Sequence, residues 1–293
     1  MNRPFGHTVK FTFSRSRTWL SLGPAWAAIA GALGSGYPEL NLTTLLQLVV
    51  LWLLVDPILG TLWTLSVPQG LWRRVTRAQL PHTPAWGFTL PYARPHSPAG
   101  DLVLLVRRYQ LWWSQSYWPE FGGQVVTFGV GLVLALLLSL LFNTTVFWLV
   151  VLAIGLTMLA GLINSDLAAV GGGRLQSVVQ FLLPWLIGVF IWPRATLFAL
   201  LVGGCYWGVY LGGLRMLGGY RRAEILFFGG QVTVLLVLLA VQLLPGAVIL
   251  SVLLLAQLLV KTKFAGAADF LPRVQAYLDI SVLIAGLSLG MLA

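Results

Sequence analysis

Charged residues are scarce in this chain. Asp, Glu, Lys and Arg make up 9% of its 293 residues, whereas soluble domains carry about 25%. Hydrophobic residues make up 58%, and the mean hydropathy is +0.87. This composition excludes an ordinary soluble domain and indicates an integral membrane protein.

Thiols and histidines are also few. The single cysteine, Cys205, lies inside an apolar run, which excludes an intrachain disulfide and a thiolate metal cluster. The three histidines, His7, His82 and His96, are scattered through polar or proline-rich segments. The sequence therefore predicts no metal site built from these side chains.

Long apolar segments dominate the rest of the chain. Nine of them are candidates for membrane-spanning helices, since a span needs about 20 mostly apolar residues. They cover approximately residues 19–34, 41–65, 121–142, 145–163, 176–192, 195–217, 223–244, 246–261 and 277–292. The first is short and follows basic residues, as in a signal peptide, but we prefer a retained helix because the charge distribution requires it. We expect residues 1–293 to form a single membrane domain, an all-α bundle of about nine transmembrane helices.

The basic residues indicate how this bundle is oriented. A net charge of +10 would suggest nucleic acid as the partner of a soluble protein, but here the arginines fall between apolar runs. There they set topology and contact lipid headgroups, so no nucleic-acid partner is expected. With a cytoplasmic N-terminus, every lysine and arginine except Arg194 falls on the cytoplasmic side. We expect the N-terminus inside, the C-terminus outside, and the functional loops on the cytoplasmic side of a bacterial plasma membrane.

Residues 67–120 are predicted to form one long cytoplasmic loop with a helix near its end. Six prolines between residues 67 and 101 are expected to prevent a regular helix there. Residues 102–118 follow with apolar side chains at helical spacing, and Asp101 is placed to cap them. We expect this amphipathic helix to lie flat at the membrane interface. The alternative is a helix packed on the cytoplasmic loops.

One carboxylate interrupts the apolar run of residues 45–64. A charge inside a membrane costs about 2.5–3.5 kcal/mol on insertion scales, so Asp56 is first interpreted as a functional site. Pro57 lacks an N–H and leaves one backbone carbonyl without its helical partner, which predicts a kink and a polar pocket. The alternative is that Asp56 lies in water at the cytoplasmic end of a shorter span. Asp269 and Asp279, around the predicted start of the last helix, are expected to be structural.

A resemblance to a known family begins in the first helix. Residues 14–25, SRSRTWLSLGPA, lead into a Gly- and Ala-rich helix and resemble the opening of the UbiA superfamily of intramembrane prenyltransferases. The chain is also similar to that family in length and in its expected nine helices with the N-terminus inside. The resemblance implies two aspartate-rich motifs, after the second and sixth helices, that hold Mg²⁺ and the diphosphate of an isoprenyl donor. It covers the whole chain in topology but only this short segment in sequence.

The aspartate-rich motifs themselves are degenerate. Only Asp56 matches the first motif, whose two later carboxylates correspond here to Leu59 and Trp63. The loop after the sixth helix has Arg221 and Arg222 but no aspartate pair. No metal ligand is therefore assigned, and Mg²⁺ is expected only if the chain is an active prenyltransferase.

Six residues are the candidates for a site at the cytoplasmic mouth of the bundle. The fourth span ends in an Asn-Ser-Asp segment, which is followed by three glycines and an arginine, and arginine suits phosphate geometry. The expected catalytic residues are Asp56 and Asp166. The expected substrate-binding residues are Asn164, Arg174, Arg221 and Arg222.

Three functions remain open at this point. The preferred one is a catalytically degenerate UbiA-like membrane protein that binds a lipid, quinone or pigment, or serves as a membrane subunit of a larger complex. Its partners would be membrane lipids, an isoprenoid, quinone or pigment, and protein subunits. The alternatives are an active intramembrane prenyltransferase, which joins an isoprenyl diphosphate to an aromatic or ring acceptor, and a transporter or permease with Asp56 at its midplane.

Overall fold

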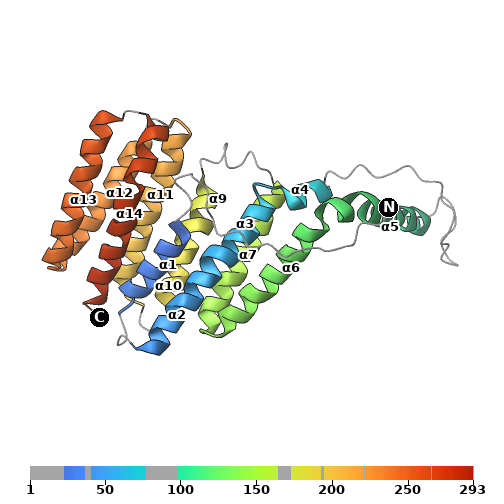
Figure 1. The fold of residues 1–293 in the computed structure, drawn as a ribbon, viewed down its shortest axis with the longest axis horizontal. Helices are drawn as coiled ribbons and strands as arrows, with labels where there is room; N and C mark the ends of the chain where they lie inside the picture. Colours follow the sequence, from blue (N-terminus) through green and yellow to red (C-terminus); the bar gives the residue numbers. More distant parts are fainter. Residues whose placement is uncertain are drawn as a thin grey trace.

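The computed structural model describes residues 23–36, 41–76, 98–163, 173–192, 195–220, 222–264 and 266–292, and within these ranges its regular structure is entirely helical (Figure 1). In chain order the helices, with η marking π-helical segments, are α1 (Gly23–Gly34), α2 (Leu42–Leu53), η1 (Leu54–Leu59), α3 (Gly60–Ser66), α4 (Leu71–Thr76), α5 (Pro98–Trp112), η2 (Trp113–Tyr117), α6 (Trp118–Leu140), α7 (Thr144–Ile163), α9 (Arg174–Ser177), η3 (Val178–Leu182), α10 (Leu183–Phe190), α11 (Leu197–Leu217), α12 (Ala223–Ala240), α13 (Leu244–Lys263) and α14 (Ala267–Gly290). The predicted all-α class is confirmed.

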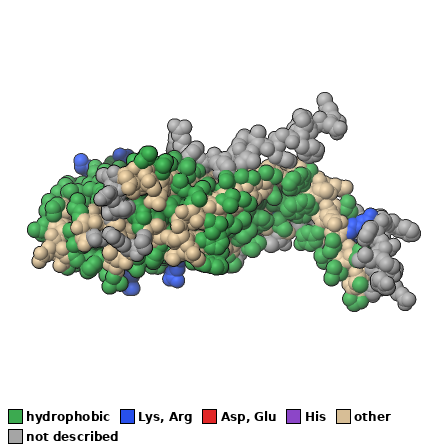
Figure 2. Space-filling model, turned by 90° about the horizontal axis from the view of Figure 1, so that it is seen from below, with side chains coloured by type: hydrophobic (Ala, Val, Ile, Leu, Met, Phe, Trp, Pro, Cys, Tyr) green, Lys and Arg blue, Asp and Glu red, His purple; other side chains and the backbone are tan. Residues whose placement is uncertain are grey.

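Seven helical stretches are long and apolar enough to cross a membrane. They are Leu42–Val75, Pro98–Leu140, Thr144–Leu162, Leu197–Leu217, Ala223–Ala240, Leu244–Lys263 and Ala267–Gly290. A shorter apolar helix covers Arg174–Phe190, and α1 has 12 residues. Many large apolar side chains of these helices, such as Leu137, Trp148 and Leu255, are exposed, as lipid contact requires, and apolar side chains are also spread over the face seen from below in Figure 2. The protein is therefore an integral membrane protein with a polytopic helical bundle.

Small residues let α1 pack closely against α10 and α14 in the middle of the bundle. A Cβ built on Gly188 of α10 would lie 2.0 Å from the carbonyl oxygen of Ala28, and one built on Gly286 of α14 would lie 2.4 Å from that of Ala30. Because glycine has no side chain at these crossings, the backbones of α10 and α14 can approach α1 directly.

Two hydrophobic cores lie on the two sides of α1 and α10. One joins residues of α2, η1, α3, α6 and α7, and the other joins residues of α11, α12, α13 and α14. Ala28 and Ala32 of α1 belong to the first core, whereas Ala27 and Ala30 belong to the second. Figure 1 shows this arrangement as two groups of helices with α1 and α10 between them. We call them the N-terminal half and the C-terminal half.

The predicted kink at Pro57 takes the form of a π-helical segment. Pro57 has no N–H to donate, and η1 widens the helix around it instead of breaking it. The hydroxyl of Thr61 donates to the carbonyl oxygen of Pro57. The chain then continues directly into α3, so α2, η1 and α3 form one continuous span.

Three helix boundaries differ from the prediction. A short helix, α4, lies within the segment that prolines were expected to keep irregular. α5 begins at Pro98, which places Asp101 in its first turn instead of at the cap, and it continues through η2 into α6. α14 begins ten residues before the predicted residue 277 and runs through Pro272, because Leu271 and Val274 beside that proline are fully buried and hold the helix in place.

Successive spans alternate in direction, and this collects the positive charge. The described lysines and arginines gather at one end of the bundle (Figure 1). There they lie in or beside the ends of α4, α9, α11, α12, α13 and α14, and α5, which carries two more arginines, lies beside the same end. One ion pair there, Lys261 Nζ to Glu224 Oε1 at 2.7 Å, joins α13 to α12. We call this the basic end.

Candidate functional site

Asp56 lies in the middle of its span. At 1.5 Å of rise per residue it is about 21 Å from Leu42 and about 15 Å from Ser66. Its side chain is half-buried, and no described residue forms a hydrogen bond or ion pair with its carboxylate. This position favours the interpretation of Asp56 as an intramembrane polar group over that of a carboxylate in water at a helix end.

Only part of the predicted cytoplasmic mouth can be described. Asn164, Asp166 and Arg221 lie outside the described residues. Arg174 is the exposed first residue of α9, and exposed Arg222 directly precedes α12. The structure therefore places both arginines at the basic end, Arg222 in the C-terminal half and Arg174 at the start of the helix that leads into α10.

Asp56 belongs to a different packing environment. η1 packs against α2, α3, α6 and α1, whereas α9 packs against η3 and α11. Residues beside Asp56, such as Val55 and Ile58, belong to the core of the N-terminal half. Asp56 thus lies by the core of the N-terminal half, whereas Arg174 and Arg222 lie at helix starts at the basic end.

The described residues around Asp56 do not fit a Mg²⁺ site. Leu59 is a half-buried apolar side chain, and Trp63 is buried against Ala160 and Val179. No group of three His, Cys, Asp or Glu side chains comes together within the described parts of the chain. Because Mg²⁺ needs several hard oxygen ligands, a single carboxylate is not enough.

A second polar site lies in the C-terminal half, around Asp279. It is a small cavity of about 30 Å³ between α1, η3, α11 and α14, enough for about one or two water molecules. Its lining residues are Gly23, Phe181, Tyr206, Val209, Tyr210, Gln275, Leu278, Asp279 and Val282. Asp279 lies near the middle of α14, with Gln275 one turn earlier on the same face of the helix. This corrects the expectation that Asp279 flanks a helix start.

Hydrogen bonds connect this cavity to the basic end. Tyr210 Oη donates to Gln180 Oε1 at 3.1 Å, and Gln176 Nε2 donates to the same oxygen at 3.0 Å. A second hydrogen bond runs between Tyr206 Oη and Ser281 Oγ, both buried. The polar side chains of η3, α11 and α14 are thereby held in fixed positions around the cavity.

A separate pair of hydrogen bonds ties the start of α9 to α11. Trp207 Nε1 donates to Ser177 Oγ at 2.9 Å, and Ser177 Oγ donates to the carbonyl oxygen of Arg174 at 2.7 Å. A Cβ on Gly173 would lie 2.9 Å from the side chain of Leu214, so the beginning of α9 packs tightly on the last turns of α11. The exposed side chain of Arg174 is therefore carried on a firmly packed helix start.

The cavity brings polar and apolar groups together. Tyr206 and Tyr210 supply hydroxyl groups, Gln275 supplies an amide, and Asp279 supplies a carboxyl group. Phe181 and Val282 supply apolar walls. The cavity can therefore take up a water molecule or a single polar group of a larger ligand.

The sequence analysis did not identify this cavity. The signals were present: Gln176 and Gln180, Tyr206 and Tyr210, and Gln275 and Asp279 are each four residues apart, which places each pair on one face of a helix. Nothing in the sequence indicated that the three faces meet. A scan against protein-family models, a search of curated proteins and a search of solved structures each found no match.

Proposed function

We propose that this chain is a UbiA-like membrane protein that has lost metal-dependent prenyl transfer and holds an amphipathic isoprenoid, such as a quinone or pigment, inside the bundle. In this proposal it has nine transmembrane helices, with the N-terminus and the basic end in the cytoplasm. It acts as a lipid-binding protein or as the membrane subunit of a larger complex.

The cavity around Asp279 is the observation that supports this proposal. A carboxyl group, an amide and two phenols face one space between spans, and such groups inside a membrane are usually retained for function. In this proposal a carbonyl or hydroxyl group of the ring enters the cavity, which has room for about one or two small polar groups, and the rest of the ring and the isoprenoid tail lie between helices toward the lipid. The missing carboxylates at Leu59 and Trp63 argue against a Mg²⁺-diphosphate site at Asp56.

The test is native mass spectrometry of the gently solubilised protein, combined with lipid extraction of the same sample. We expect a ring-bearing isoprenoid bound in stoichiometric amount. Asp279→Leu and Tyr210→Phe should lower its content, since each removes a polar group of the cavity. Asp269→Asn is the matched control, because Asp269 lies exposed in the first turn of the same helix.

Two results would contradict the proposal. If the protein carries no isoprenoid and no partner subunit, it is neither the proposed lipid-binding protein nor the proposed membrane subunit. A gain in mass on addition of Mg²⁺ and a prenyl diphosphate would instead restore the active prenyltransferase, and Asp56 would be the first residue to replace.

One observation favours a second candidate, a transporter. The π-helical segment at Asp56 interrupts the regular helix near the middle of its span, as unwound segments do at transporter substrate sites. Uptake that is unchanged by Asp56→Asn, measured in vesicles for a substrate that the wild type carries, would exclude this role of Asp56.

A further inference from the structure

Two buried polar atoms, one in α4 and one in α6, have no hydrogen-bond partner among the described residues. They are Nε1 of Trp72 and Oε1 of Gln124. The indole N–H can only donate and the amide oxygen can only accept. Buried donors and acceptors that stay unpaired destabilise a fold, so nearly all of them in proteins are hydrogen-bonded to other residues or to ordered water. Both atoms therefore need a partner that the described residues do not supply.

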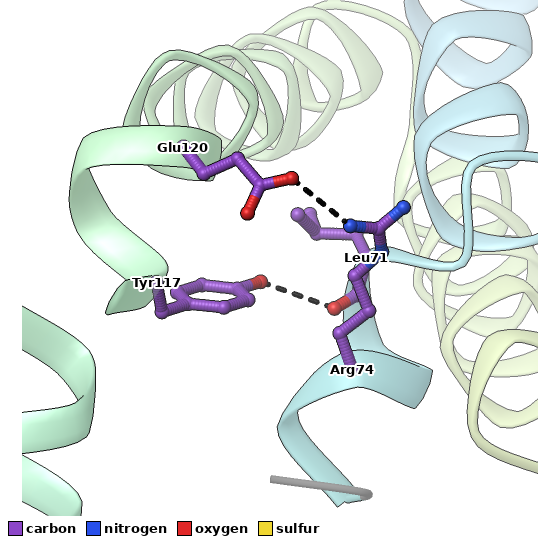
Figure 3. A network of polar contacts seen from close by, with 4 residues as sticks. All are labelled: Leu71, Arg74, Tyr117 and Glu120. Carbon is purple, nitrogen blue, oxygen red and sulfur yellow. Dashed lines mark hydrogen bonds and ion pairs between the residues drawn. The ribbon is translucent and has the colours of Figure 1, made fainter. Parts of the chain in front are cut away.

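Side-chain contacts hold α4 against η2 and the start of α6, as Figure 3 shows. Tyr117 Oη donates to the carbonyl oxygen of Leu71 at 3.0 Å, and Arg74 Nη1 lies 3.4 Å from Glu120 Oε1. The Arg74 guanidinium also lies 4.2 Å from the ring centre of Phe121. These contacts fix the root of α5, the end at which it continues into η2.

Gln124 lies between two of the contacts that α4 makes with α6. Trp72 packs edge to face on Phe128, with the ring centres 5.0 Å apart. Phe121, Gln124 and Phe128 are separated by three and four residues, so they share one face of α6. Arg74 contacts this face one turn before Gln124, and Trp72 contacts it one turn after. The amide oxygen and the indole N–H therefore belong to the same contact between α4 and α6.

The two atoms define the chemical group that fits between them. A carbonyl oxygen would accept from the indole N–H but leave the amide oxygen without a donor, whereas an ammonium group would do the reverse. The guanidinium of Arg74, one turn away, also repels a cation. A hydroxyl group both accepts and donates, so it satisfies the two atoms at once.

The contact between α4 and α6 lies close to water at the basic end. Arg74 and Glu120 form their ion pair with 51% and 66% of their side chains exposed. Glu120 lies one turn before Gln124 on α6. A small hydroxyl-bearing group thus has only about one helical turn to cross from the surface.

We propose that α4 and α6 form a binding site for one hydroxyl group. Its oxygen accepts a hydrogen bond from Trp72 Nε1 and donates one to Gln124 Oε1, which links α4 to α6. Water and the hydroxyl of an alcohol, such as a glycerol headgroup, share this chemistry. The inference does not rest on the ligand proposed for the Asp279 cavity, whose lining belongs to other helices.

Gln124→Met in the full chain tests whether the site is occupied, because the two possibilities predict opposite signs. If a hydroxyl bridges the two atoms, methionine removes its acceptor, and the unfolding midpoint in detergent should fall by about 2–8 °C. In an empty site, methionine would replace an unpaired oxygen with an apolar group, and the midpoint would stay or rise. Within Trp72→Phe the same substitution should cost at most about half as much, because the hydroxyl has already lost its donor.

Gln110→Met is the matched control for this experiment. Gln110 is exposed on α5, so the same chemical change there should leave the midpoint unchanged. A midpoint that stays or rises in Gln124→Met, or a cost that is the same with and without Trp72, would overturn the proposal.

Indole proton resonances of the protein with isotope-labelled tryptophan identify the source of the hydroxyl. Trp72→Phe assigns the Trp72 signal, and Trp185, whose Nε1 donates to the carbonyl oxygen of Ala199 at 3.0 Å, is the hydrogen-bonded reference. The protein is measured as isolated and again after delipidation into phosphatidylcholine, whose headgroup has no hydroxyl. We expect a downfield Trp72 proton, as for Trp185, in the isolated protein.

The second preparation separates the two sources. Water as the ligand leaves the Trp72 signal unchanged and gives it a cross-peak to water, which Trp185 should lack. An alcohol as the ligand shifts the signal on delipidation, and the extracted lipids restore it. A Trp72 proton at the position of an indole without a hydrogen bond in both preparations would overturn the proposal.

Discussion

Gly188→Ala tests how the two halves of the bundle are joined. The new Cβ would lie 2.0 Å from the carbonyl oxygen of Ala28 and 2.9 Å from the backbone nitrogen of Ala32. Since ordinary van der Waals contact begins near 3.4 Å, α10 and α1 must separate by about 1.4 Å at this point. Both neighbouring atoms belong to backbone, so no side chain can rotate away. We expect a cost of about 2–3 kcal/mol, in the range measured for overpacked cores.

Gly204→Ala is the matched control for this substitution. Gly204 also lies inside a span, in α11, but a Cβ there would meet no atom within 4 Å. Alanine stabilises a helix by up to about 1 kcal/mol relative to glycine, so this variant should equal or exceed the wild type in stability. At about 2–4 °C per kcal/mol, Gly188→Ala should lower the thermal unfolding midpoint in detergent by about 4–12 °C. Equal midpoints for the two variants would refute the close α1–α10 crossing.

Three further sets of variants test other features by the same unfolding assay. Gln231 and Gln257 exchange two hydrogen bonds of 3.1 and 2.9 Å in a buried position, so replacing either one with leucine should cost about 1–3 kcal/mol, whereas replacing both should cost less than either alone. Tyr117→Phe removes the hydrogen bond to the Leu71 carbonyl and should cost about 1 kcal/mol; no loss would show that this contact does not fix the root of α5. Gly219→Ala should cost about 1 kcal/mol because Gly219 ends α11 with a φ of +75°, and a neutral result would contradict that turn.

Composition and apolar periodicity predicted nine spans, and seven of them are found among the described residues as helices long and apolar enough to cross a membrane, whereas the predicted spans 19–34 and 176–192 are shorter helices there. α7, for example, begins at Thr144 and ends at Ile163, within one residue of the expected start. This works because a membrane leaves few alternatives to an apolar helix for a long apolar run. Boundaries near polar residues were predicted less well. α14 continues through polar residues and Pro272 toward the basic end because buried neighbours such as Phe270 hold it, and such packing is not visible in local sequence.

Asp56 and Asp279 show that local sequence also limits the prediction of functional sites. Asp56 was identified because its local sequence is apolar on both sides. Asp279 was not, because its predicted position near a helix start gave it an ordinary role, and its partners come from distant parts of the chain. Gln180, Tyr210 and Asp279 meet only through the packing of η3, α11 and α14.

The separation of these carboxylates bears on the chemistry that the chain can perform. A diphosphate bridged by Mg²⁺ needs several carboxylates around one space. Here Asp56 lies within the core of the N-terminal half, Asp279 lines a cavity of the C-terminal half, and α1 and α10 stand between those halves. A close crossing such as that of Gly188 on Ala28 leaves no room between α1 and α10 at that level. The described carboxylates therefore cannot share one metal-bound diphosphate, and each must be tested as part of a separate site.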